Sequence, residues 1–489
     1  MKAKCVMVLG TSSGAGKSWL TTALCRWYAR KGFKVAPFKA QNMSNNARVV
    51  TSHNGLGEIG SAQYFQALAS YAEPDVRMNP LLLKPEADTH SQVVLLGEVS
   101  DALTQTPWRD RSEKVWLQIA ASLDALRADN DIVVMEGAGS PAEINLMAHD
   151  IVNLRVAAHA DARCLLVTDI DKGGAFAHLY GTWALMSLED RNRIHGFVLN
   201  KFRGDASLLA PAPQMLENLT GVATVAVLPM WWQHGLPEED GVFDDRSRSS
   251  GLVTKTVAVI AYPRISNLDE FQPLKNVSGL RLVWARSPSD LAGLGKDDWI
   301  ILPGSKNTSS DLRWLRSQGL DQSIVDHANH GRFVLGICGG LQILGEALVD
   351  AHGVDGNAAG LGLLPLVTTF EPLKTVKRTL AKFAHVRGVL SALSGIELSG
   401  YEIHHGQTVA HTDRLPNGNG IHEIATNLAW QNAAGNVTGI YLHGLFENPA
   451  VLKSLFGAET ITLETVFDGL ADFLDQHVSA HILQKLIAT

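Results

Sequence analysis

Residues 6–32 constrain the fold of this chain more than any other stretch. Residues 6–9 are all apolar and indicate a short buried strand, which a glycine-rich loop follows. The loop ends in Lys17 and Ser18, where apolar residues begin to recur at helical spacing until Gly32 closes the helix. In such a strand–loop–helix unit, backbone N–H groups at the helix start bind phosphate, the lysine meets its charge, and the serine can ligate Mg²⁺. The stretch therefore predicts a phosphate-binding loop in an α/β sheet.

The loop departs from the usual phosphate-binding pattern at one place. Thr11 occupies the position of the first glycine, and Gly10 comes one residue too early. A glycine-rich turn that merely caps a helix is the alternative interpretation. The Gly-Lys-Ser end of the loop and both flanking elements favour phosphate binding.

The composition is that of an ordinary globular protein. The chain has 489 residues, 46% hydrophobic and 19% charged, which is enough for about two to four domains. The net charge of −7 argues against a nucleic-acid surface, and no apolar run approaches the roughly 18–20 residues of a membrane span. Four widely spaced cysteines fit a reducing compartment, and the N-terminus lacks the features of a signal peptide. We therefore expect a cytoplasmic protein with no nucleic-acid partner and no membrane span.

Strands alternate with helical stretches through the first half. Mostly apolar runs at 131–135, 164–168 and 197–199 indicate parallel strands, and their rhythm predicts an open, doubly wound α/β sheet. Glu136 follows the first of these runs, which places it at the carboxyl end of the sheet, where an acid can hold Mg²⁺ beside a nucleotide. Capping a turn is the alternative role for this side chain.

Amide and hydroxyl side chains gather just after the predicted strand at 35–37. Burying so many polar groups is costly unless something hydrogen-bonds them, so a polar ligand is one interpretation and a solvated loop is the other. Lys84 lies between an apolar run and a proline, and is either an edge residue or a second phosphate contact. The polar residues after the strand are Lys39, Gln41, Asn42, Ser44, Asn45 and Asn46.

The second half contains a pattern typical of a reactive cysteine. A mostly apolar run at 333–337 ends in Cys338, which glycines flank on both sides. This pattern predicts a nucleophile elbow, in which a strand turns sharply into a helix and exposes the reactive atom. His443 follows a later strand and would take the thiol proton; a buried structural cysteine and a packed histidine are the alternatives. The backbone N–H groups expected to stabilise an oxyanion lie near Gly304, Ser305 and Gly339.

His404 and His405 are adjacent in a segment that we expect to be extended. Neighbouring side chains on an extended segment point to opposite faces. We therefore predict no metal site at this pair.

Several motifs of the first half occur together in one known family. They are the early glycine of the loop, the segments at 37–44 and 78–80, the Glu-Gly-Ala-Gly-Ser-Pro run at 136–141, and Asn-Lys-Phe-Arg-Gly-Asp at 200–205. With them the chain resembles the relatives of dethiobiotin synthetase and, among these, the cobyric acid synthase family.

This resemblance implies ATP and Mg²⁺ as cofactors. Lys39 would contact the reacting phosphoryl or carboxylate group, and Asn200 would contact adenine. The implied ATP-binding residues are Thr11, Gly14, Gly16, Lys17, Ser18 and Asn200. The implied metal ligands are Ser18, Glu136 and Glu58, and the implied substrate contacts are Gln41, Asn42, Ser44 and Asp150.

The second half resembles glutamine amidotransferase domains with a cysteine nucleophile. Its His-Gly-Leu-Phe run at 443–446 resembles the branch that includes the cobyric and cobyrinic acid amide synthases, and the segments at 262–267 and 400–406 also resemble the cobyric acid synthase family. Relatives usually place a glutamate two residues after the histidine, where this chain has Leu445, and Glu447 cannot be assumed to replace it. The resemblance thus implies a catalytic Cys–His pair whose orienting group the sequence does not reveal.

The two resemblances together cover nearly the whole chain, roughly 5–450. They imply an α/β protein of two doubly wound domains, an N-terminal P-loop parallel sheet and a C-terminal flavodoxin-like amidotransferase sheet. The expected organisation is a synthetase domain at 1–239, a linker at 240–252, an amidotransferase domain at 253–450 and a helical tail at 451–489.

The implied reaction is ATP- and glutamine-dependent amidation, in which ammonia released at Cys338 attacks an acyl phosphate. The implied partners are glutamine and adenosylcobyrinic acid a,c-diamide or a related corrinoid, amidated at its b, d, e and g carboxylates. The nearest alternative is the sister cobyrinic acid a,c-diamide synthase, with the same chemistry on other carboxylates. An alternative of another class is a partitioning-type ATPase or nucleotide switch fused to an inactive glutaminase-like domain.

Overall fold

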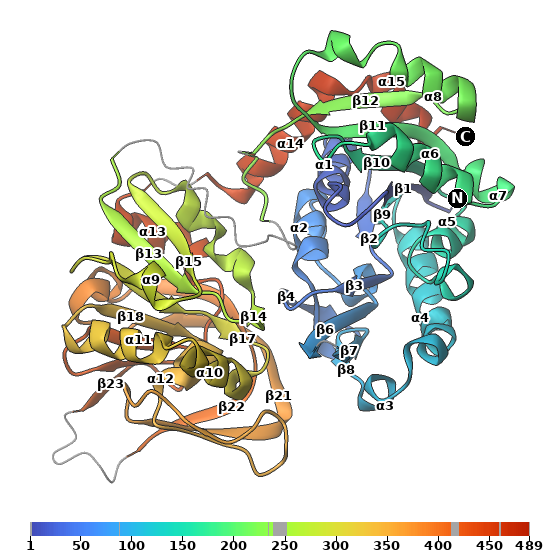
Figure 1. Ribbon diagram of the computed structural model, residues 1–489. Helices are drawn as coiled ribbons and strands as arrows, with labels where there is room; N and C mark the ends of the chain where they lie inside the picture. The colour runs from blue at the N-terminus through green and yellow to red at the C-terminus, as the bar shows by residue number, and fades with distance from the viewer. Residues whose placement is uncertain are drawn as a thin grey trace.

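Two bodies, each built around its own sheet, make up the protein (Figure 1). The computed structural model describes residues 2–87, 89–232, 234–237, 252–411, 420–458 and 461–488. All but the last residue of the predicted linker, 240–252, lies outside these described residues. The predicted fold class, α/β with two doubly wound domains, is confirmed.

The first sheet is parallel throughout. Its residues are buried on both faces, as in strands that helices cover from either side. In spatial order the strands are β12 (Thr224–Pro229), β11 (Ile194–Phe202), β10 (Arg163–Asp169), β1 (Lys4–Gly10), β9 (Ile132–Glu136) and β2 (Val35–Phe38).

Two hydrophobic clusters cover the two faces of this sheet. Because side chains alternate along a strand, Val6 and Val8 of β1 join one cluster, while Met7 and Leu9 join the other. The helices of this body are α1 (Lys17–Arg30), α2 (Ser61–Ala69), α3 (Asp101–Thr104), α4 (Trp108–Asp129), α5 (Leu154–Ala160), α6 (Ala175–Leu185), α7 (Leu188–Arg191) and α8 (Ala212–Thr220).

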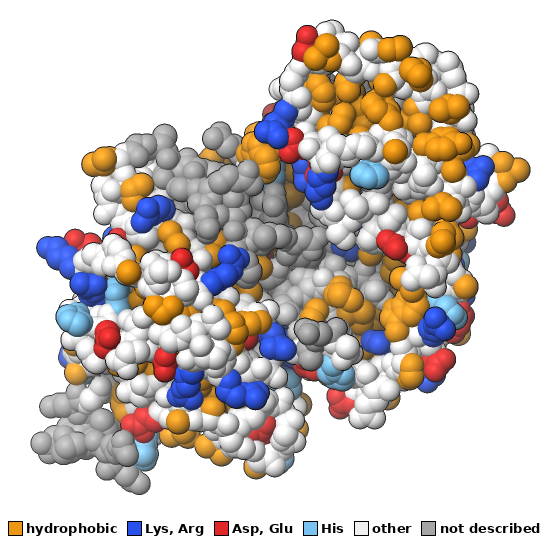
Figure 2. Space-filling view, viewed as in Figure 1, with side chains coloured by type: hydrophobic (Ala, Val, Ile, Leu, Met, Phe, Trp, Pro, Cys, Tyr) orange, Lys and Arg blue, Asp and Glu red, His pale blue; other side chains and the backbone are white. Residues whose placement is uncertain are grey.

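Exposed hydrophobic side chains gather over α6 and α8 (Figure 2), among them Tyr180, Leu185, Met215 and Leu219.

A hairpin and a small sheet extend the first body toward the second (Figure 1). The hairpin pairs β4 (Ala47–Ser52) with β5 (Gly55–Gly60). The small sheet contains β3 (Gln41–Met43), β6 (Leu81–Ala87), β7 (His90–Leu95) and β8 (Glu98–Val99). Three short 3₁₀ turns complete this body: η1 (Val76–Met78), η2 (Met147–His149) and η3 (Ala206–Leu209).

Among the described residues, the second sheet has seven strands, and all are parallel except β24, which runs antiparallel to both of its neighbours, β25 and β23. In spatial order they are β15 (Leu280–Ala285), β13 (Lys255–Ile260), β16 (Trp299–Leu302), β18 (Phe333–Ile337), β25 (Val437–Ile440), β24 (Ala429–Asn432) and β23 (Ile421–Ala425).

Helices and a long hairpin surround the second sheet. The hairpin pairs β21 (Leu366–Lys382) with β22 (Glu397–Ala410). The helices are α9 (Pro288–Leu291), α10 (Thr308–Ser317), α11 (Leu320–Asn329), α12 (Gly339–Leu344) and α13 (Pro449–Phe456). Short elements are β14 (Ile265–Ser266), η4 (Leu268–Asn276), β17 (Gly304–Ser305), β19 (Ala347–Val349), β20 (Ala358–Ala359), η5 (Gly388–Leu393) and η7 (Leu445–Glu447).

The last two helices, α14 (Leu463–His477) and α15 (Ala480–Lys485), return to the first body (Figure 1). Phe467 and Leu470 of α14 belong to the hydrophobic cluster that α1 forms with the first sheet. Trp27 donates its indole N–H to Asp475 at 2.6 Å, and Tyr28 donates its hydroxyl to the Leu483 carbonyl at 2.8 Å. α13, which begins before residue 451, instead packs in the core of the second body.

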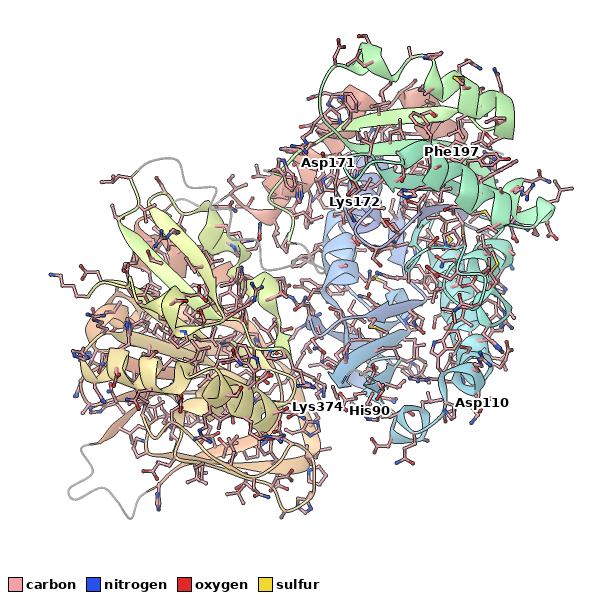
Figure 3. All side chains as sticks on the ribbon, in the orientation of Figure 1. His90, Asp110, Asp171, Lys172, Phe197 and Lys374 are labelled. Carbon is pink, nitrogen blue, oxygen red and sulfur yellow. The ribbon has the colours of Figure 1, made fainter. Side chains whose placement is uncertain are left out.

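Ion pairs join the two bodies. Lys374 lies on β21 at the domain boundary (Figure 3), and its ammonium group contacts Glu58 of β5 at 2.5 Å. Lys306 contacts Glu86 of β6 at 2.7 Å. The interface therefore contains specific charged contacts.

Among the residues that the structure describes, none of the helices combines the length and the apolar character that a bilayer crossing requires.

The packing of α14 on α1 predicts a stability effect in the tail. Leu470→Ala removes a fully buried side chain and should lower the free energy of unfolding by about 2–5 kcal/mol. The matched control is Gln476→Ala, an exposed position on the same helix, which should change it little. Calorimetric unfolding of both variants measures the difference; equal unfolding temperatures would contradict the packing role of the tail.

Candidate active sites

The predicted strand–turn–helix unit around Cys338 is present in the second sheet. β18 ends at Ile337, α12 starts at Gly339, and Cys338 between them has φ 50° and ψ −106°. A non-glycine residue with positive φ is strained, as expected of a nucleophile elbow. Glycine is also required two residues after Cys338, because a Cβ added at Gly340 would lie 1.8 Å from the Leu302 carbonyl oxygen.

His443 lies beside the elbow because the neighbouring strands place it there. β25 pairs in parallel with β18, with Ile440 opposite Ile337, so the residues after both strands meet at one edge of the sheet. An isolated bridge to Tyr401 holds the histidine backbone, and the Tyr401 and His443 rings stack with centroids 5.2 Å apart. The side chain of His443 is buried, at 1% exposure.

Glu270 of η4 is the orienting group that the sequence did not reveal. Its Oε1 lies 3.1 Å from His443 Nδ1, and its Oε2 accepts the Gly444 backbone N–H at 3.1 Å. The carboxylate is fully buried. It therefore fixes both the ring and the turn that follows it, and leaves Nε2 as the ring nitrogen available to the elbow.

The electrostatics keep this histidine protonated. Burial alone would disfavour the imidazolium, but the Glu270 carboxylate and the Cys338 side chain outweigh burial and raise the pKa of His443 to about 10. An imidazolium next to a cysteine favours the thiolate, which is the nucleophilic form of the side chain. The arrangement can therefore carry out nucleophilic attack on a carbonyl group.

The three predicted oxyanion residues also come together at the elbow. A Cβ added at Gly339 would lie 2.7 Å from the Ser305 backbone nitrogen, and one at Gly304 would lie 3.0 Å from His443 Cε1. Ser305 donates its hydroxyl to Asp311 at 2.6 Å, which fixes the turn, and burial raises the pKa of Asp311 to about 7. Gly304, Ser305 and Gly339 therefore lie close together beside Cys338 and His443, and their role as oxyanion donors stays a prediction.

His404 and His405 bind different partners. His404 contacts Glu402 Oε2 at 3.1 Å, whereas His405 contacts the Glu371 carbonyl at 3.0 Å. The two rings thus do not converge on a shared partner.

The second candidate site is a cavity of about 470 Å³ at the carboxyl edge of the first sheet. Its volume lies within the range of about 300–1,000 Å³ typical of small-molecule sites. One wall is the predicted phosphate-binding loop, with Lys17 and Ser18 starting α1. Gly16 at φ 101° packs so closely on Asn200 that a Cβ there would lie 2.0 Å from its Nδ2. Asn200 also donates to the Ala15 carbonyl at 2.9 Å, so it fixes the shape of the loop.

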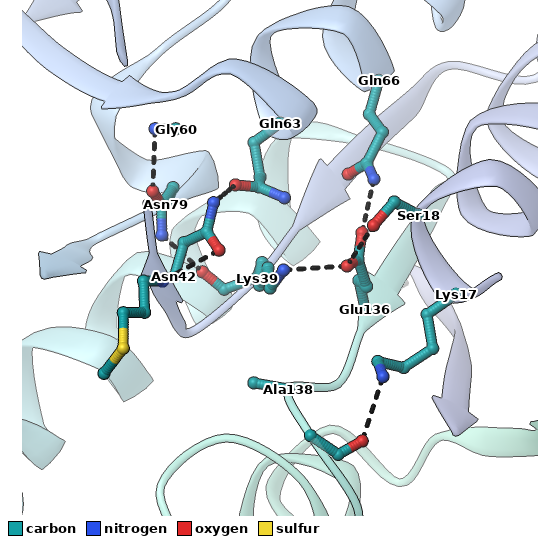
Figure 4. Close-up of polar contacts among 12 residues, drawn as sticks. Lys17, Ser18, Lys39, Asn42, Gly60, Gln63, Gln66, Asn79, Glu136 and Ala138 are labelled. Carbon is teal, nitrogen blue, oxygen red and sulfur yellow. Dashed lines mark hydrogen bonds and ion pairs between the residues drawn. The ribbon is translucent and has the colours of Figure 1, made fainter. Parts of the chain in front are cut away.

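Three side chains converge on Glu136 at the edge of this cavity (Figure 4). Lys39 Nζ and Ser18 Oγ each lie 2.8 Å from Glu136 Oε1, and Gln66 Nε2 lies 2.6 Å from Oε2. Parallel pairing of β2 with β9 brings Lys39 to Glu136, because Lys39 directly follows β2 and Glu136 ends the adjacent strand β9. Burial alone would favour the neutral acid, but Lys39 and the two hydrogen bonds hold the pKa of Glu136 below its usual value.

Ser18 and Glu136 fit a Mg²⁺ ion that also binds nucleotide phosphates. Both present oxygen atoms at the cavity edge, and Mg²⁺ usually takes only one or two protein ligands besides phosphate and water. In the described ranges, no cluster of three or more His, Cys, Asp or Glu side chains is placed to hold a metal by itself. Metal binding here would therefore depend on the nucleotide.

Glu58 is not brought together with the other predicted metal ligands. Its carboxylate is buried, with Oε2 on Lys84 and Oε1 on Lys374, both at 2.5 Å. Burial alone would raise its pKa, but the two lysines lower it well below the usual range. Because Lys374 comes from the second body, Glu58 forms part of the domain interface, and Lys84 is its partner within the first body.

Several predicted contacts lie outside the cavity lining. Asn42 lines the cavity, whereas Gln41 and Ser44 do not. Thr11 contacts the Thr168 hydroxyl at 2.9 Å. Asp150 accepts the backbone N–H groups of residues 152, 153 and 155, and so caps the turn before α5.

The opposite wall of the cavity was missed by sequence reasoning. Leu268, Asp269 and Gln272 of η4, together with Trp284, line it from the second body. Trp231 also lines it and stacks on Phe473 of α14, with ring centroids 4.9 Å apart. No local motif marks these residues, because they reach the cavity only when the two bodies are docked.

Comparisons with known proteins match each body to a domain family. Residues 6–233 match the model of the CobQ/CobB/MinD/ParA nucleotide binding domain, and residues 256–451 match that of the CobB/CobQ-like glutamine amidotransferase domain. The chain is 72% identical over 488 residues to the cobyric acid synthase of Variovorax paradoxus (strain S110). It is 69% identical over 489 residues to the cobyric acid synthase of Polaromonas naphthalenivorans (strain CJ2). Both alignments cover 100% of this chain and 100% of the relative. It is 58% identical to the cobyric acid synthase of Leptothrix cholodnii (strain ATCC 51168 / LMG 8142 / SP-6), with 99% of this chain and 97% of the relative covered.

The close packing at the elbow predicts that Gly340 tolerates no side chain. Gly340→Ala should destabilise the second body, because the added Cβ collides with the Leu302 backbone. Gly293→Ala is the control, since no atom lies within 4 Å of a Cβ built there. Thermal unfolding should separate the two variants by several degrees, and equal stability would contradict the elbow geometry.

Proposed function

The chain belongs to the cobyric acid synthase family, and from that premise we propose that it amidates the b, d, e and g carboxylates of adenosylcobyrinic acid a,c-diamide or a related corrinoid, with ammonia from glutamine. The observation that most supports this proposal is the placement of η4, which contacts His443 on one side and lines the phosphate-loop cavity on the other. One short segment thus separates a nitrogen-releasing site from an activating site.

In the second body, Cys338 would attack the side-chain amide of glutamine. The His443 imidazolium protonates the leaving ammonia, the N–H groups around Ser305 and Gly339 bind the oxyanion, and water then releases glutamate from the thioester. Glu270 does not touch the substrate; it positions His443 and stabilises its charged form.

In the first body, ATP would convert a substrate carboxylate into an acyl phosphate. A carboxylate has no adequate leaving group, whereas phosphate leaves readily. Lys17 and the loop N–H groups would hold the phosphates, and Lys39 would neutralise charge on the transferred group. Mg²⁺ held by Ser18 and Glu136 would supply further charge stabilisation. Ammonia then forms the C–N bond as the C–O bond to phosphate breaks, and the nitrogen gives up one proton.

The substrate's environment follows from the same cavity. Asn42 and Met43 of β3 line the cavity near Lys39, so they are suited to contact a polar, anionic corrinoid.

We place the reaction in the cytoplasm, because the chain's four cysteines are free and buried, which is typical of proteins in a reducing compartment.

The nucleophile assignment predicts a separation of nitrogen sources. Cys338→Ala should abolish glutamate release and glutamine-driven amidation but keep amidation driven by ammonium chloride, because the first body is untouched. Mass spectrometry of the corrinoid, counting amide increments, together with a glutamate assay measures both. Full glutamine-driven activity in Cys338→Ala would show that the nucleophile is wrong, and ATP turnover without amidation would favour the nucleotide-switch alternative.

The Glu270 contact predicts a shift in a pH profile. Glu270→Gln keeps the size of the side chain but removes its charge, so the pKa of His443 should fall below about 10, because a cation loses its stabilising anion. The alkaline limb of kcat/KM for glutamine hydrolysis should therefore move to lower pH. The rate at neutral pH should drop about 10²–10⁴-fold, because the ring loses its orienting charge.

The control for this variant is Glu423→Gln, an exposed carboxylate of the same body. Its profile should match that of the wild type. An unshifted alkaline limb in Glu270→Gln would contradict the role of Glu270, even if the rate fell.

A further inference from the structure

η4 presents two neighbouring carboxylates to two different sites. Glu270 points to His443, whereas Asp269 lines the cavity of the first body. Both side chains are buried, with 0% and 3% exposure. The residues that face the two candidate sites are therefore consecutive in the chain, and η4 is the wall between them.

The two carboxylate oxygens of Asp269 differ in their hydrogen bonding. Oδ2 forms an ion pair with Arg48, which also binds Glu447 with N–O distances of 2.6 and 2.8 Å. Oδ1 is buried and has no hydrogen-bond donor within the described parts of the chain. A buried carboxylate oxygen without a donor is rare in folded proteins, and an unfilled acceptor on a cavity wall is suited to a donor ligand.

The charge around this oxygen favours a small nitrogen donor. Burial alone would lower the pKa of Arg48, but Asp269 and Glu447 hold it well above its usual value, so the guanidinium stays charged. One cation between two carboxylates leaves one negative charge in the cluster. Ammonia can donate an N–H to such an oxygen, and its conjugate acid also gains from the charge.

We infer that Asp269 Oδ1 binds ammonia, or ammonium, where the nitrogen enters the cavity from the glutaminase site. The inference rests on the proposed roles of Cys338 and His443. Asp269 is the chain neighbour of Glu270 and lies on the cavity side of the wall, so it offers the nitrogen an acceptor between its release and its attack on the acyl phosphate. Asp269 holds the nitrogen on that path.

The test compares how much released ammonia reaches the product. Asp269→Asn should keep glutamine hydrolysis within about twofold, because Glu270 and His443 are unchanged, but should lower the amide formed per glutamate about tenfold. In the Cys338→Ala background, the half-saturating ammonium chloride concentration should rise by a similar factor. The two arms distinguish ammonia made from glutamine from ammonium supplied in solution.

Two further variants keep the test decisive. Glu447→Gln breaks the same Arg48 network away from the cavity and should leave the amide-to-glutamate ratio unchanged. Asp269→Leu removes the acceptor oxygen but leaves Arg48 paired with Glu447, and should lower the ratio as Asp269→Asn does.

An unchanged ratio in both Asp269 variants, or an unchanged ammonium requirement, would overturn the binding site. Glutamine hydrolysis and amidation falling in parallel would also overturn it, because Asp269 would then act through His443. Absence of glutamate release in the wild type would instead refute the proposed function.

Discussion

The buried guanidinium of Arg48 is the contact on which both sites depend. It comes from β4 of the first body and forms ion pairs with Asp269 and Glu447 of the second. Its central carbon, Cζ, also lies over the rings of Phe65 and Tyr401, 5.0 and 5.1 Å from their centroids. Buried ion pairs contribute little net stability, because desolvation offsets the Coulomb attraction, but they demand one geometry. Arg48 therefore determines how η4 sits between the bodies.

Hydrogen bonds at the start of η4 reinforce that geometry. Asn46 and Asn267 exchange contacts across the boundary: the Asn267 side chain accepts the Ala47 N–H, and the Asn46 side chain accepts the Leu268 N–H, both at 2.9 Å. Buried N–H groups need such acceptors, so separating the bodies would leave them dependent on water. Side chains of the first body and Asn267, just before η4, thus hold the wall between the two sites in place.

Local features could be predicted from the sequence, and features that depend on docking could not. The phosphate loop and the elbow were predictable because each is contained in one strand–turn–helix unit. Glu270 was not, because it lies 173 positions before His443 and belongs to no recognisable motif. The ion pair of Glu58 with Lys374 could not be predicted, because Lys374 comes from the other body. The sequence predicted a helical tail but not its packing on α1, because the two segments are far apart in the sequence.

The position of Leu445 explains why the orienting carboxylate comes from elsewhere. Leu445 is 1% exposed and packs in the hydrophobic core of the second body, so the position that usually holds the orienting glutamate contributes to that core instead. His443 needs only an acceptor at Nδ1, whatever its place in the chain, and η4 supplies one. η4 also forms the cavity wall, and its Asp269 forms an ion pair with Arg48 of the first body. Because Glu270 of the same segment contacts His443, the position of the histidine ring depends on the docking of the first body. A glutamate beside the histidine would have been independent of that docking.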